Sequence, residues 1–572
     1  MRSLIRRDRE WMLSPSPDES ITQEIKSALS CNTPFAVLLA RRGGNDWQRL
    51  VDPDAHDFHS PWLLTGMEAA VSRIMEGIKR EERIFIHGDF DVDGLTGAAV
   101  LYLGLLPLLP RGKIKVEVGD RTRGHGLSKG FVRRAIEEDF PLVITADCGI
   151  SNAAETASLH TAGVDTVITD HHLSPPVLPK AAAIINPQQP GDTYPNKDLA
   201  GVGVAYKLIS GLYERLGRPT PLQLLDLVAL GTIADLVPLS NQGEVENRAM
   251  VREGFSVLAN GEGAPGLRVL MKKMSVNPAR IDTFDVSYFI APKLNAANRA
   301  GDPKVAFLLL TTGKLPRAEY LTEVLLDYNK DREIAQNDLL AQAERAIADG
   351  EIDPVQDGIT IVAGKHWNRG IIGLTASNLV DRYQVPAIVI SKGGKLSRAS
   401  CRSVEGFDIV ACLKDNSDLF TRYGGHPMAA GFSIPTSALP LLYQRIRRYA
   451  AAHRTELAER VERIDTNVNL SEIDQRLYTN LCSLSPYGPG NQSPRFLSRG
   501  CSFTALSLVG SRRQHLKGKV SQDGTSLPFI AFNMGRYINT FEREKGACLV
   551  FRTGFDTWQG TVQAEGIDLV TD

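Results

Sequence analysis

Three carboxylates stand close together in the segment HGDFDVDG at residues 87–94. Asp89, Asp91 and Asp93 alternate there, directly after a short apolar run. Because like charges repel one another, packing these carboxylates together is unfavourable unless cations neutralise them. Mg²⁺ and Mn²⁺ prefer carboxylate and water ligands, and Mn²⁺ also accepts imidazole. The segment therefore predicts a divalent-metal site; a calcium loop or a solvated acidic turn is the alternative, although the EF-hand spacing is not met.

Further polar clusters follow other short apolar runs of the chain. They are Asp147 after residues 142–145, the triplet Asp170, His171 and His172 after residues 166–169, and Asp235 after residues 227–233. Taken singly, each aspartate also fits a helix cap and the histidines fit an exposed pair. Four clusters of carboxylate and imidazole groups at predicted strand ends favour one shared metal site over four unrelated caps.

The elements that must position these groups alternate in type. Short β-branched runs at residues 83–87, 142–145 and 166–169 are separated by helical stretches, such as residues 96–106 and a helix that begins near Asn152. This alternation predicts βαβ units and a parallel sheet. In such sheets ligands bind beyond the carboxyl ends of the strands, where each polar cluster lies. We also interpret residues 227–233 as a strand of this kind.

The rest of the chain predicts three further parts. Residues 305–349 carry apolar side chains at helical spacing and contain proline only at Pro316, which predicts one long helix between two lobes. A second α/β domain begins with a strand at residues 358–363 and ends near Arg454. Short strand-like runs then predict a small β-barrel, of OB type, at residues 501–508, 515–520, 528–532, 547–553 and 560–564.

Bulk composition excludes several classes of protein. Lys and Arg number 65 and Asp and Glu 66, so any nucleic-acid site must be a local basic groove. The 7 cysteines form no CxxC pair, which argues against a disulfide framework or a zinc site and favours a reducing cytoplasm. The longest apolar run, near residues 99–109, is too short to span a bilayer, and the first residues lack a secretory h-region.

Several segments, in order, resemble the DHH phosphoesterase superfamily. HGDFDVDG, TADCG, TDHH and GTIADLVPL are similar to its four motifs, and APKLNAANR at residues 291–299 is similar to its P-R-L-N-A-A-G-R. RYGGHPMAAGF at residues 422–432 resembles the G-G-H-x-x-A-A-G of the DHHA1 domain. PYGPGN at residues 486–491 and HLKGKV at residues 515–520 resemble the OB-like third domain of the RecJ family. The resemblance covers roughly residues 80–572, and the order and length match the RecJ family.

The resemblance implies a role for particular residues. The metal ligands would be His87, Asp89, Asp91, Asp93, Asp147, His171 and Asp235, with Asp147 bridging two Mn²⁺ or Mg²⁺ ions. The catalytic set would be Asp91, Asp93, Asp147, His171, His172 and Asp235, with Asp170 orienting the two histidines. The substrate phosphates would contact Asn295, Arg299, Ser400, Arg402 and His426.

The chain departs from the family pattern at three segments. The first is Gly124, His125, Gly126 and Leu127 in place of the family's G-Y-G-L, after a shorter segment, which is expected to alter a substrate contact. The family's G-S-G-R-S is here Ala399, Ser400, Cys401, Arg402 and Ser403, so both glycines are replaced. The glycine of N-A-A-G-R is Asn298, and because asparagine tolerates positive φ, we expect a turn to persist there.

The activity that the resemblance implies is that of a single-stranded-DNA-specific exonuclease. It would release 5′-mononucleotides in the 5′-to-3′ direction by two-metal phosphodiester hydrolysis, in recombination and repair, alongside a single-strand-binding protein. The expected parts are an N-terminal segment (1–80), a DHH catalytic domain (81–303), a connecting helix (304–350), a DHHA1 substrate-binding domain (351–455) and an OB-like nucleic-acid-binding domain (465–572).

Two alternatives remain open. One is a DHH phosphodiesterase that acts on short oligoribonucleotides, against which the OB-like part argues. The other is a non-catalytic DHH scaffold, against which the complete set of metal motifs argues. We expect a cytoplasmic enzyme without a membrane partner.

Overall fold

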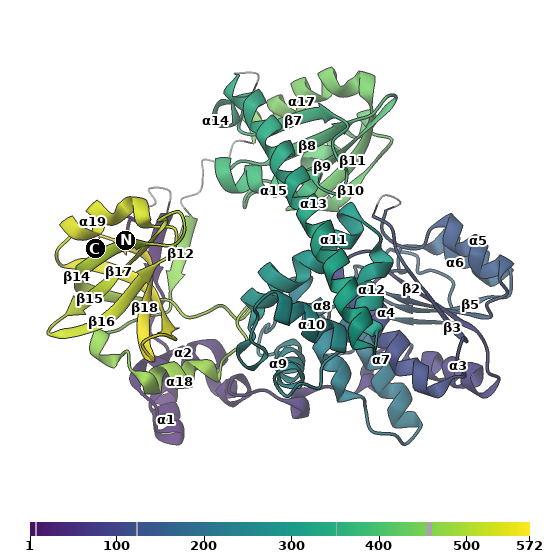
Figure 1. Cartoon of the computed structure of the whole chain (residues 1–572), viewed down its shortest axis with the longest axis horizontal. Coiled ribbons are helices and arrows are strands. Elements are labelled where there is room, and N and C mark those ends of the chain that lie inside the picture. Colours follow the sequence, from purple (N-terminus) through teal and green to yellow (C-terminus); the bar gives the residue numbers. More distant parts are fainter. Residues whose placement is uncertain (6–8, 122–123, 350–351, 454–459, 572) are drawn as a thin grey trace. The chain divides into compact units, whose positions relative to one another are not determined.

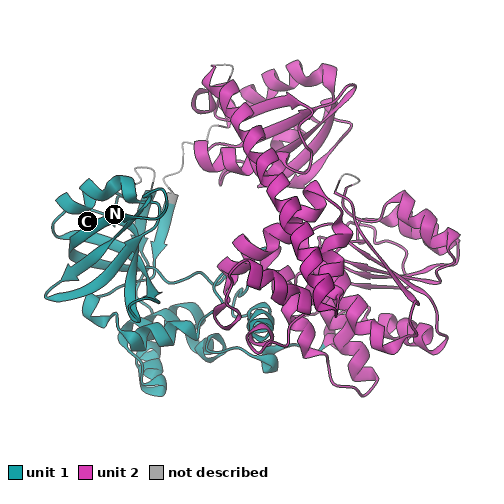
Figure 2. Ribbon diagram, viewed as in Figure 1, with its two compact units in different colours: residues 1–60, 236–255, 457–572 teal, residues 61–235, 256–456 magenta. Residues whose placement is uncertain are grey.

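The chain is described here from a computed structural model, which covers residues 1–5, 9–121, 124–349, 352–453 and 460–571. These residues pack as two compact units (Figure 2). Unit 1 contains residues 1–60, 236–255 and 457–572, and unit 2 contains residues 61–235 and 256–456. Among the described residues, no helix combines the length and apolarity that crossing a bilayer requires. The bounds of the five predicted parts stay a prediction.

A five-stranded parallel sheet forms the centre of the first domain of unit 2 (Figure 1). Its order is β3-β2-β4-β5-β6, with bounds β2 Ile84–Gly88, β3 Ile114–Val118, β4 Leu142–Ala146, β5 Asp165–Thr169 and β6 Ala183–Ile185. The predicted parallel sheet is thus confirmed. Every residue of β2 and β4 is buried, because helices cover both faces of a parallel sheet, and this explains their unbroken apolar runs.

Helices on both faces of this sheet supply its core. On one face, α5 (Lys129–Glu137) and α6 (Ala153–Thr161) pack over Phe85 and Val143. On the other, α4 (Val92–Leu105), α7 (Gly201–Arg215) and α3 (Met67–Lys79) contact the strands and one another. Because α4 starts where β2 ends, the acidic segment between them is fixed at the carboxyl edge of the sheet.

The strand expected at residues 227–233 is wrong. These residues lie in α8 (Leu225–Ala234), and every residue of this helix except the last is buried. A helix that is buried on all sides shows no amphipathic period, so a short apolar run of this kind cannot be told from a buried strand by its pattern. The helix packs against α4 and α7, which brings its carboxyl end, and with it Asp235, to the edge of the sheet.

Asp226 on α8 is a buried carboxyl outside the acidic cluster, and it predicts a pH-dependent stability. Its two oxygens accept hydrogen bonds from the backbone amides of Leu227 (2.6 Å) and Ala264 (2.7 Å), and burial raises its pKa to about 6. A raised pKa means that the folded state holds the proton more tightly, so stability falls as pH rises from about 4 to about 6. We expect the stability of the wild type relative to Asp226→Asn to fall by about 3 kcal/mol across that window.

Urea unfolding of both proteins at several pH values measures this difference, because titrations shared by the two chains cancel. A difference that stays constant between pH 4 and pH 7 would show that Asp226 is ionised throughout.

The single long helix expected at residues 305–349 is wrong at its start. Two helices occupy this segment, α12 (Pro303–Thr311) and α13 (Leu315–Ala348), and Thr312 between them has an extended backbone. Pro316 stands in the first turn of α13, where a proline needs no amide donor, so it marks the start of that helix. The remaining 34-residue helix confirms the long connection to the second domain.

The second domain of unit 2 is built on a mixed sheet. The order is β10-β11-β9-β8-β7, with bounds β7 Thr360–Lys365, β8 Ala387–Lys392, β9 Leu396–Arg402, β10 Arg422–His426 and β11 Ala429–Pro435. Only β7 and β8 run parallel. One face packs against α15 (Ile372–Tyr383) and α13, and the other contains the core that α16 (Ile409–Lys414) and α17 (Leu439–Ala452) cover.

A closed five-stranded barrel dominates unit 1 and confirms the predicted OB-like part. Strands β14 (Phe496–Val509), β15 (His515–Gln522), β16 (Thr525–Ala531), β18 (Thr561–Val570) and β17 (Ala547–Asp556) follow one another, and β17 pairs back to β14. Residues 1–60 belong to the same unit: α1 (Glu19–Leu29) and α2 (Thr33–Gly43) share its core, and β1 (Arg9–Leu13) pairs with β12 (Arg460–Ile464).

Candidate active site

Most of the predicted metal ligands meet at the carboxyl edge of the parallel sheet. Asp89 follows β2, Asp147 follows β4 and Asp170 follows β5, while Asp93 lies in the first turn of α4. Asp235 reaches the same place from the end of α8. All of these residues belong to unit 2.

Three groups of side chains bring their ligand atoms within 4.8 Å of one another. The groups are Asp89, Asp91 and Asp147; Asp147, His171 and His172; and Asp93, His171 and Asp235. Two residues belong to two groups each, namely Asp147 and His171. A set that shares its members in this way is suited to two neighbouring cations held by common ligands.

Backbone amides hold Asp93 in place. Its two oxygens accept hydrogen bonds from the amides of Gly201 (2.7 Å) and Val202 (2.8 Å), at the positive end of α7. Gly201 also lies against Asp147, and a Cβ added there would stand 2.5 Å from the Cβ of Asp147. Glycine is therefore required where α7 approaches the acidic cluster.

The carboxylates destabilise one another's charged forms. Burial, and then the charges of Asp93 and Asp91, raise the pKa of Asp147 well above its usual value. Burial, and then the charge of Asp235, do the same for Asp93, and burial raises the pKa of Asp235 to about 7. Such a cluster is unfavourable as free carboxylates and gains stability when cations bind.

The two adjacent histidines have different roles in the cluster. His171 places Nε2 3.1 Å from Asp147 and 3.6 Å from Asp235. Burial, and then the neighbouring His172, lower the pKa of His171 to about 4, so its imidazole is neutral near pH 7. His172 instead contacts Asp170 through Nδ1 at 2.8 Å, and this contact raises its pKa although burial acts in the opposite direction.

Asp170 is a structural anchor rather than a ligand. It accepts hydrogen bonds from the backbone amides of Ile150, His171 and His172 and is fully buried. Burial alone would raise its pKa, but the hydrogen bonds to His172 and to the amides lower it to about 2. Its charge therefore persists, and it holds the ring of His172 and the backbone of His171, while its role in orienting both rings stays a prediction.

The donor set fits divalent metal ions. Asp147 Oδ1 is buried yet makes no hydrogen bond within the described structure, and its 3.1 Å contact with His171 lacks hydrogen-bond geometry. Asp147 also has a positive φ of 60°, an unfavourable conformation for a residue with a Cβ. A buried, unpaired oxygen among carboxylates and a neutral imidazole is what a bound cation satisfies.

His87 and Asp89 are less clearly ligands. His87 is buried in β2 against the ring of Phe131, with centroids 4.5 Å apart, and belongs to none of the three groups. Its role as a ligand stays a prediction. Asp89 is a member of one group and also contacts Nδ1 of His125 at 2.9 Å. The sequence did not single out His125 for this role, because nothing local links it to a carboxylate 36 positions away.

Arginines from both domains of unit 2 gather beside the acidic cluster. Burial lowers the pKa of Arg299 to about 9, and the next largest effects come from Arg121, Arg332 and Arg402, all positively charged. Arg299 donates to the carbonyl of Gly370 in the second domain (2.6 Å). Crowded guanidinium groups next to carboxylates form a place where a phosphate would be held between cations and metal ligands. Sequence reasoning missed Arg121 and Arg332.

The other predicted substrate contacts lie at varying depth. Arg402 donates to the hydroxyl of Ser400 (3.3 Å), and both side chains face Gly373 near the start of α15. Asn295 on α11 (Ala291–Ala300) has a buried amide oxygen that makes no hydrogen bond in the described structure. His426 is exposed on the edge strand β10. Their substrate roles remain predictions.

Asn298 does not form the expected turn. It lies inside α11 and has no positive φ. Its amide nitrogen donates to the carbonyls of Phe90 (2.7 Å) and Gly119 (3.2 Å), and its oxygen accepts from the backbone amide of Arg121 (3.1 Å). The side chain thus joins α11 to the loop between Asp89 and Asp91. Asn298 supplies the hydrogen-bond partners that these backbone groups do not find in a helix or a strand.

We therefore expect Asn298→Ala to lower the cleavage rate by about 10-fold, because the loop that carries Asp91 loses its hydrogen bond at Phe90 and the adjacent segment loses those at Gly119 and Arg121. The apparent affinity for Mn²⁺ should fall in the same variant, as measured by titrating activity with metal. Asn277→Ala, which removes an exposed asparagine from the turn at Ala279, is the matched control. Unchanged metal affinity in Asn298→Ala would contradict this role.

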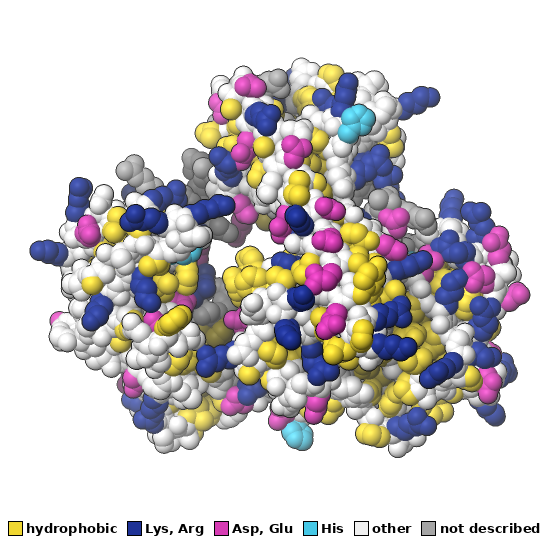
Figure 3. Space-filling model, viewed as in Figure 1, with side chains coloured by type: hydrophobic (Ala, Val, Ile, Leu, Met, Phe, Trp, Pro, Cys, Tyr) yellow, Lys and Arg dark blue, Asp and Glu magenta, His cyan; other side chains and the backbone are white. Residues whose placement is uncertain are grey.

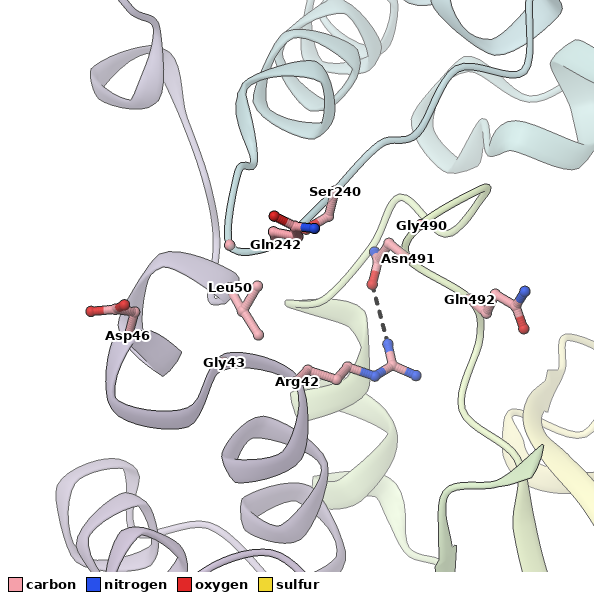
Figure 4. Close-up of a pocket in the computed structure, with 10 residues that line it drawn as sticks. Arg42, Gly43, Asp46, Leu50, Ser240, Gln242, Gly490, Asn491 and Gln492 are labelled. Carbon is pink, nitrogen blue, oxygen red and sulfur yellow. Dashed lines mark hydrogen bonds between the residues drawn. The ribbon is translucent and has the colours of Figure 1, made fainter. Parts of the chain in front are cut away.

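A separate cavity lies in unit 1 and contains none of these groups (Figure 4). It has a volume of about 480 Å³ and is lined by α2, by the segment around Gln242 and by Gly490 to Gln492. Arg42 in its wall donates to the side chain of Asn491 (3.1 Å) and pairs with Asp465. Its polar groups thus serve to hold the PYGPGN segment in place.

The fold and the site together define a three-part phosphoesterase architecture. The chain matches the models of the DHH family, N-terminal domain (residues 83–232), of the DHHA1 domain (residues 356–452) and of the RecJ OB domain (residues 464–566).

Named relatives support a more specific assignment. The chain is similar to the single-stranded-DNA-specific exonuclease RecJ of Bacillus subtilis (33% identity over 91% of this chain and 65% of that protein). It is also similar to that of Thermus thermophilus (32% identity over 88% of this chain and 72% of that protein). The crystal structure of RecJ in complex with Mn²⁺ from Thermus thermophilus superposes with a TM-score of 0.83 at 28% identity, covering 99% of this chain and 80% of that one. The chain belongs to the RecJ family.

Proposed function

We propose that this protein is a single-stranded-DNA-specific exonuclease that releases 5′-mononucleotides in the 5′-to-3′ direction. The main support for the proposal is the cluster of carboxylate and imidazole groups, in which the ligand groups have members in common. This cluster lies in unit 2 beside Arg299 and the arginines around it. Membership of a family whose curated relatives are named single-stranded-DNA-specific exonucleases supplies the substrate. The chain spans 65% of the length of the Bacillus subtilis relative, so we transfer that activity as a proposal.

We assign two divalent ions, Mn²⁺ or Mg²⁺, to the three ligand groups. Solved relatives are described as complexes with Mn²⁺ and with Mg²⁺, which supports this choice. The ligands would be Asp89, Asp91, Asp93, Asp147, His171 and Asp235, with His87 as a further candidate. A bound ion supplies Lewis acidity and a water of lowered pKa.

The chain's own residues bind and orient the substrate. Arg299 and Arg402 neutralise the phosphate from the side opposite the carboxylates, while Asn295, Ser400 and His426 are candidates for further contacts. His172 is held through Nδ1 by Asp170, so its other ring nitrogen is oriented to donate to a phosphate oxygen. Fixed donors of this kind stabilise charge that develops during displacement.

The cellular setting is part of the proposal. We place the enzyme in the cytoplasm, in DNA recombination and repair, with single-stranded DNA as substrate and a single-strand-binding protein as a partner. We also propose the five-part division into residues 1–80, 81–303, 304–350, 351–455 and 465–572. The closed barrel favours a nucleic-acid-binding role for the last part, because small barrels of this type bind single strands through a groove.

A second candidate is a phosphodiesterase for short oligoribonucleotides. The same ligand groups would serve it, and the barrel disfavours it because a short substrate needs no extended binding surface. The shared ligand groups argue against a scaffold without catalysis. Many buried like charges destabilise a fold, and a purely structural role does not require them.

Digestion of end-labelled DNA tests the proposal. Single strands labelled at the 5′ or the 3′ end, beside their duplexes, are incubated with Mn²⁺, Mg²⁺ or EDTA. We expect labelled mononucleotide at once from the 5′-labelled single strand, only with metal, and intact duplex. Cleavage restricted to di- to tetranucleotides would favour the second candidate, and no cleavage with either metal would favour the scaffold.

A further inference from the structure

In the second domain of unit 2, the sheet face on which α15 packs continues past β9 onto β11 and the edge strand β10, where side chains are accessible. In β9 and β11 the residues alternate between buried and accessible, as a sheet with one covered face requires. The accessible side chains are Arg398, Ser400 and Arg402 on β9, and Ala429, Gly431 and Ser433 on β11. The edge strand β10 is exposed along its whole length. Figure 3 shows Lys and Arg side chains gathered over this part of the domain.

The strand register arranges this face in three rows. Directly opposed residues lie on the same face, which gives the rows Arg402–Ala429–His426, Ser400–Gly431–Gly424 and Arg398–Ser433–Arg422. The central strand supplies only small side chains, whereas β9 carries Arg402 and Arg398 in the outer rows and β10 carries His426 and Arg422 there. A Cβ added at Gly424 would meet no atom within 4 Å. The rows therefore form a strip with small residues along its middle and an arginine in each outer row.

The first row is already part of the proposed phosphate site, but the third is not. Along β9, Arg398 and Arg402 are four residues apart, which corresponds to about 13 Å. An extended single strand covers this distance with roughly two nucleotides. The third row is thus placed where a later phosphate of the same strand would lie.

The third row has a third cation beside it. Burial lowers the pKa of Arg398, and the next effects come from the like charges of Arg369 and Arg422. A Cβ at Gly124 would stand 3.9 Å from the Arg422 guanidinium, and the neighbouring His125 contacts Asp89. The row is therefore continuous with the metal-ligand cluster.

We propose that Arg398 and Arg422 form a second phosphate-binding site, which holds the single strand roughly two nucleotides from the phosphate at Arg402. This inference rests on the proposed function, because it takes single-stranded DNA as the polyanion. A free phosphate ion has the same chemistry as a ligand, and the experiment separates the two.

The test uses the full chain with Arg398→Gln and Arg422→Gln combined. Binding of dodecathymidylate and dithymidylate, both 5′-phosphorylated and fluorescently labelled at the 3′ end, is followed by anisotropy in EDTA over a series of salt concentrations. We expect the affinity for the dodecamer to fall about 10-fold or more, and its salt slope to lose about 1.4 for two lost contacts. Binding of the dimer, which ends before the third row, should be unchanged. Arg448→Gln, an exposed arginine on α17 over the opposite face, is the matched control.

Three results would overturn the inference. The first is that the variant keeps the wild-type affinity and salt slope for the dodecamer. The second is that the variant loses as much affinity for the dimer as for the dodecamer, which would place the defect in the first row or in the fold. The third is normal dodecamer binding with loss of the thermal stabilisation by inorganic phosphate, which would assign the row to a free anion. Tight dodecamer binding by a wild type that cleaves nothing would contradict the exonuclease proposal and leave this site standing.

Discussion

Asp147→Asn is expected to lower metal-dependent cleavage on the order of 10³-fold, the largest effect we foresee for a single substitution. Asp147 is a member of two of the three ligand groups, so its loss weakens both proposed ion positions at once. The amide keeps the shape of the carboxyl and removes its charge. The measurement is the rate of mononucleotide release at saturating Mn²⁺.

The same substitution should stabilise the metal-free protein. The pKa of Asp147 is raised well above its usual value, by burial first and then by Asp93 and Asp91, so its ionised form destabilises the fold near neutral pH. In EDTA the variant should therefore melt at a higher temperature than the wild type. Added Mn²⁺ should raise the melting temperature of the wild type more than that of the variant.

Asp139→Asn is the matched control for both measurements. Asp139 is exposed before β4, at the edge of the sheet away from the cluster, and asparagine accepts its positive φ of 53°. Its activity and its response to metal should equal those of the wild type. Full activity in Asp147→Asn would show that the proposed ligand assignment is wrong.

Arg299→Gln is expected to lower kcat/KM for single-stranded DNA by about 10²-fold or more. Arg299 is crowded by Arg121, Arg332 and Arg402, and burial together with their charges lowers its pKa to about 9. A bound phosphate relieves this repulsion, so the interaction with substrate is strong and its loss is large. Steady-state kinetics on 5′-phosphorylated and 5′-hydroxyl strands should show a smaller difference between them in the variant.

An anion-binding assay separates this role from a structural one. Sulfate or phosphate should raise the melting temperature of the wild type, and the rise should be smaller in Arg299→Gln because one cation of the site is missing. Arg268→Gln, on the exposed face of α10 (Pro265–Lys273), should behave as the wild type. An equal rise in both variants would mean that Arg299 binds no anion.

Local sequence patterns were sufficient to predict an element when the type of that element follows from its own residues. β2, β4 and β5 were predicted because short β-branched runs alternate with helices, and the clusters after them were predicted because parallel strands end at one edge. The five strands of the barrel were found in the same way, from runs separated by turn residues. Asp235 lies in the cluster where the sequence placed it, although its element was predicted wrongly because α8 is buried on all sides.

Long-range contacts explain most of what the sequence missed. His125 joins the site through Asp89, and Asn298 joins it through Phe90, Gly119 and Arg121. No periodicity or spacing records such pairs. His125 meets Asp89 only when β3 pairs with β2, and Asn298 meets Phe90 and Gly119 only when α11 reaches the segments that follow these two strands. The break before α13 was missed because one proline near a helical pattern marks either a kink or a start.

By itself the sequence determined the parallel sheet, the carboxylate and imidazole chemistry at its edge and the order of the domains, because these follow from local residue types and their periodicity. The tertiary structure alone decided which side chains the ligand groups share, that Asp170 accepts backbone hydrogen bonds while His171 lies within the groups, and that arginines of two domains lie beside the cluster. It also decided the rows across β9, β11 and β10, because strand register depends on pairing between segments that are distant in the chain.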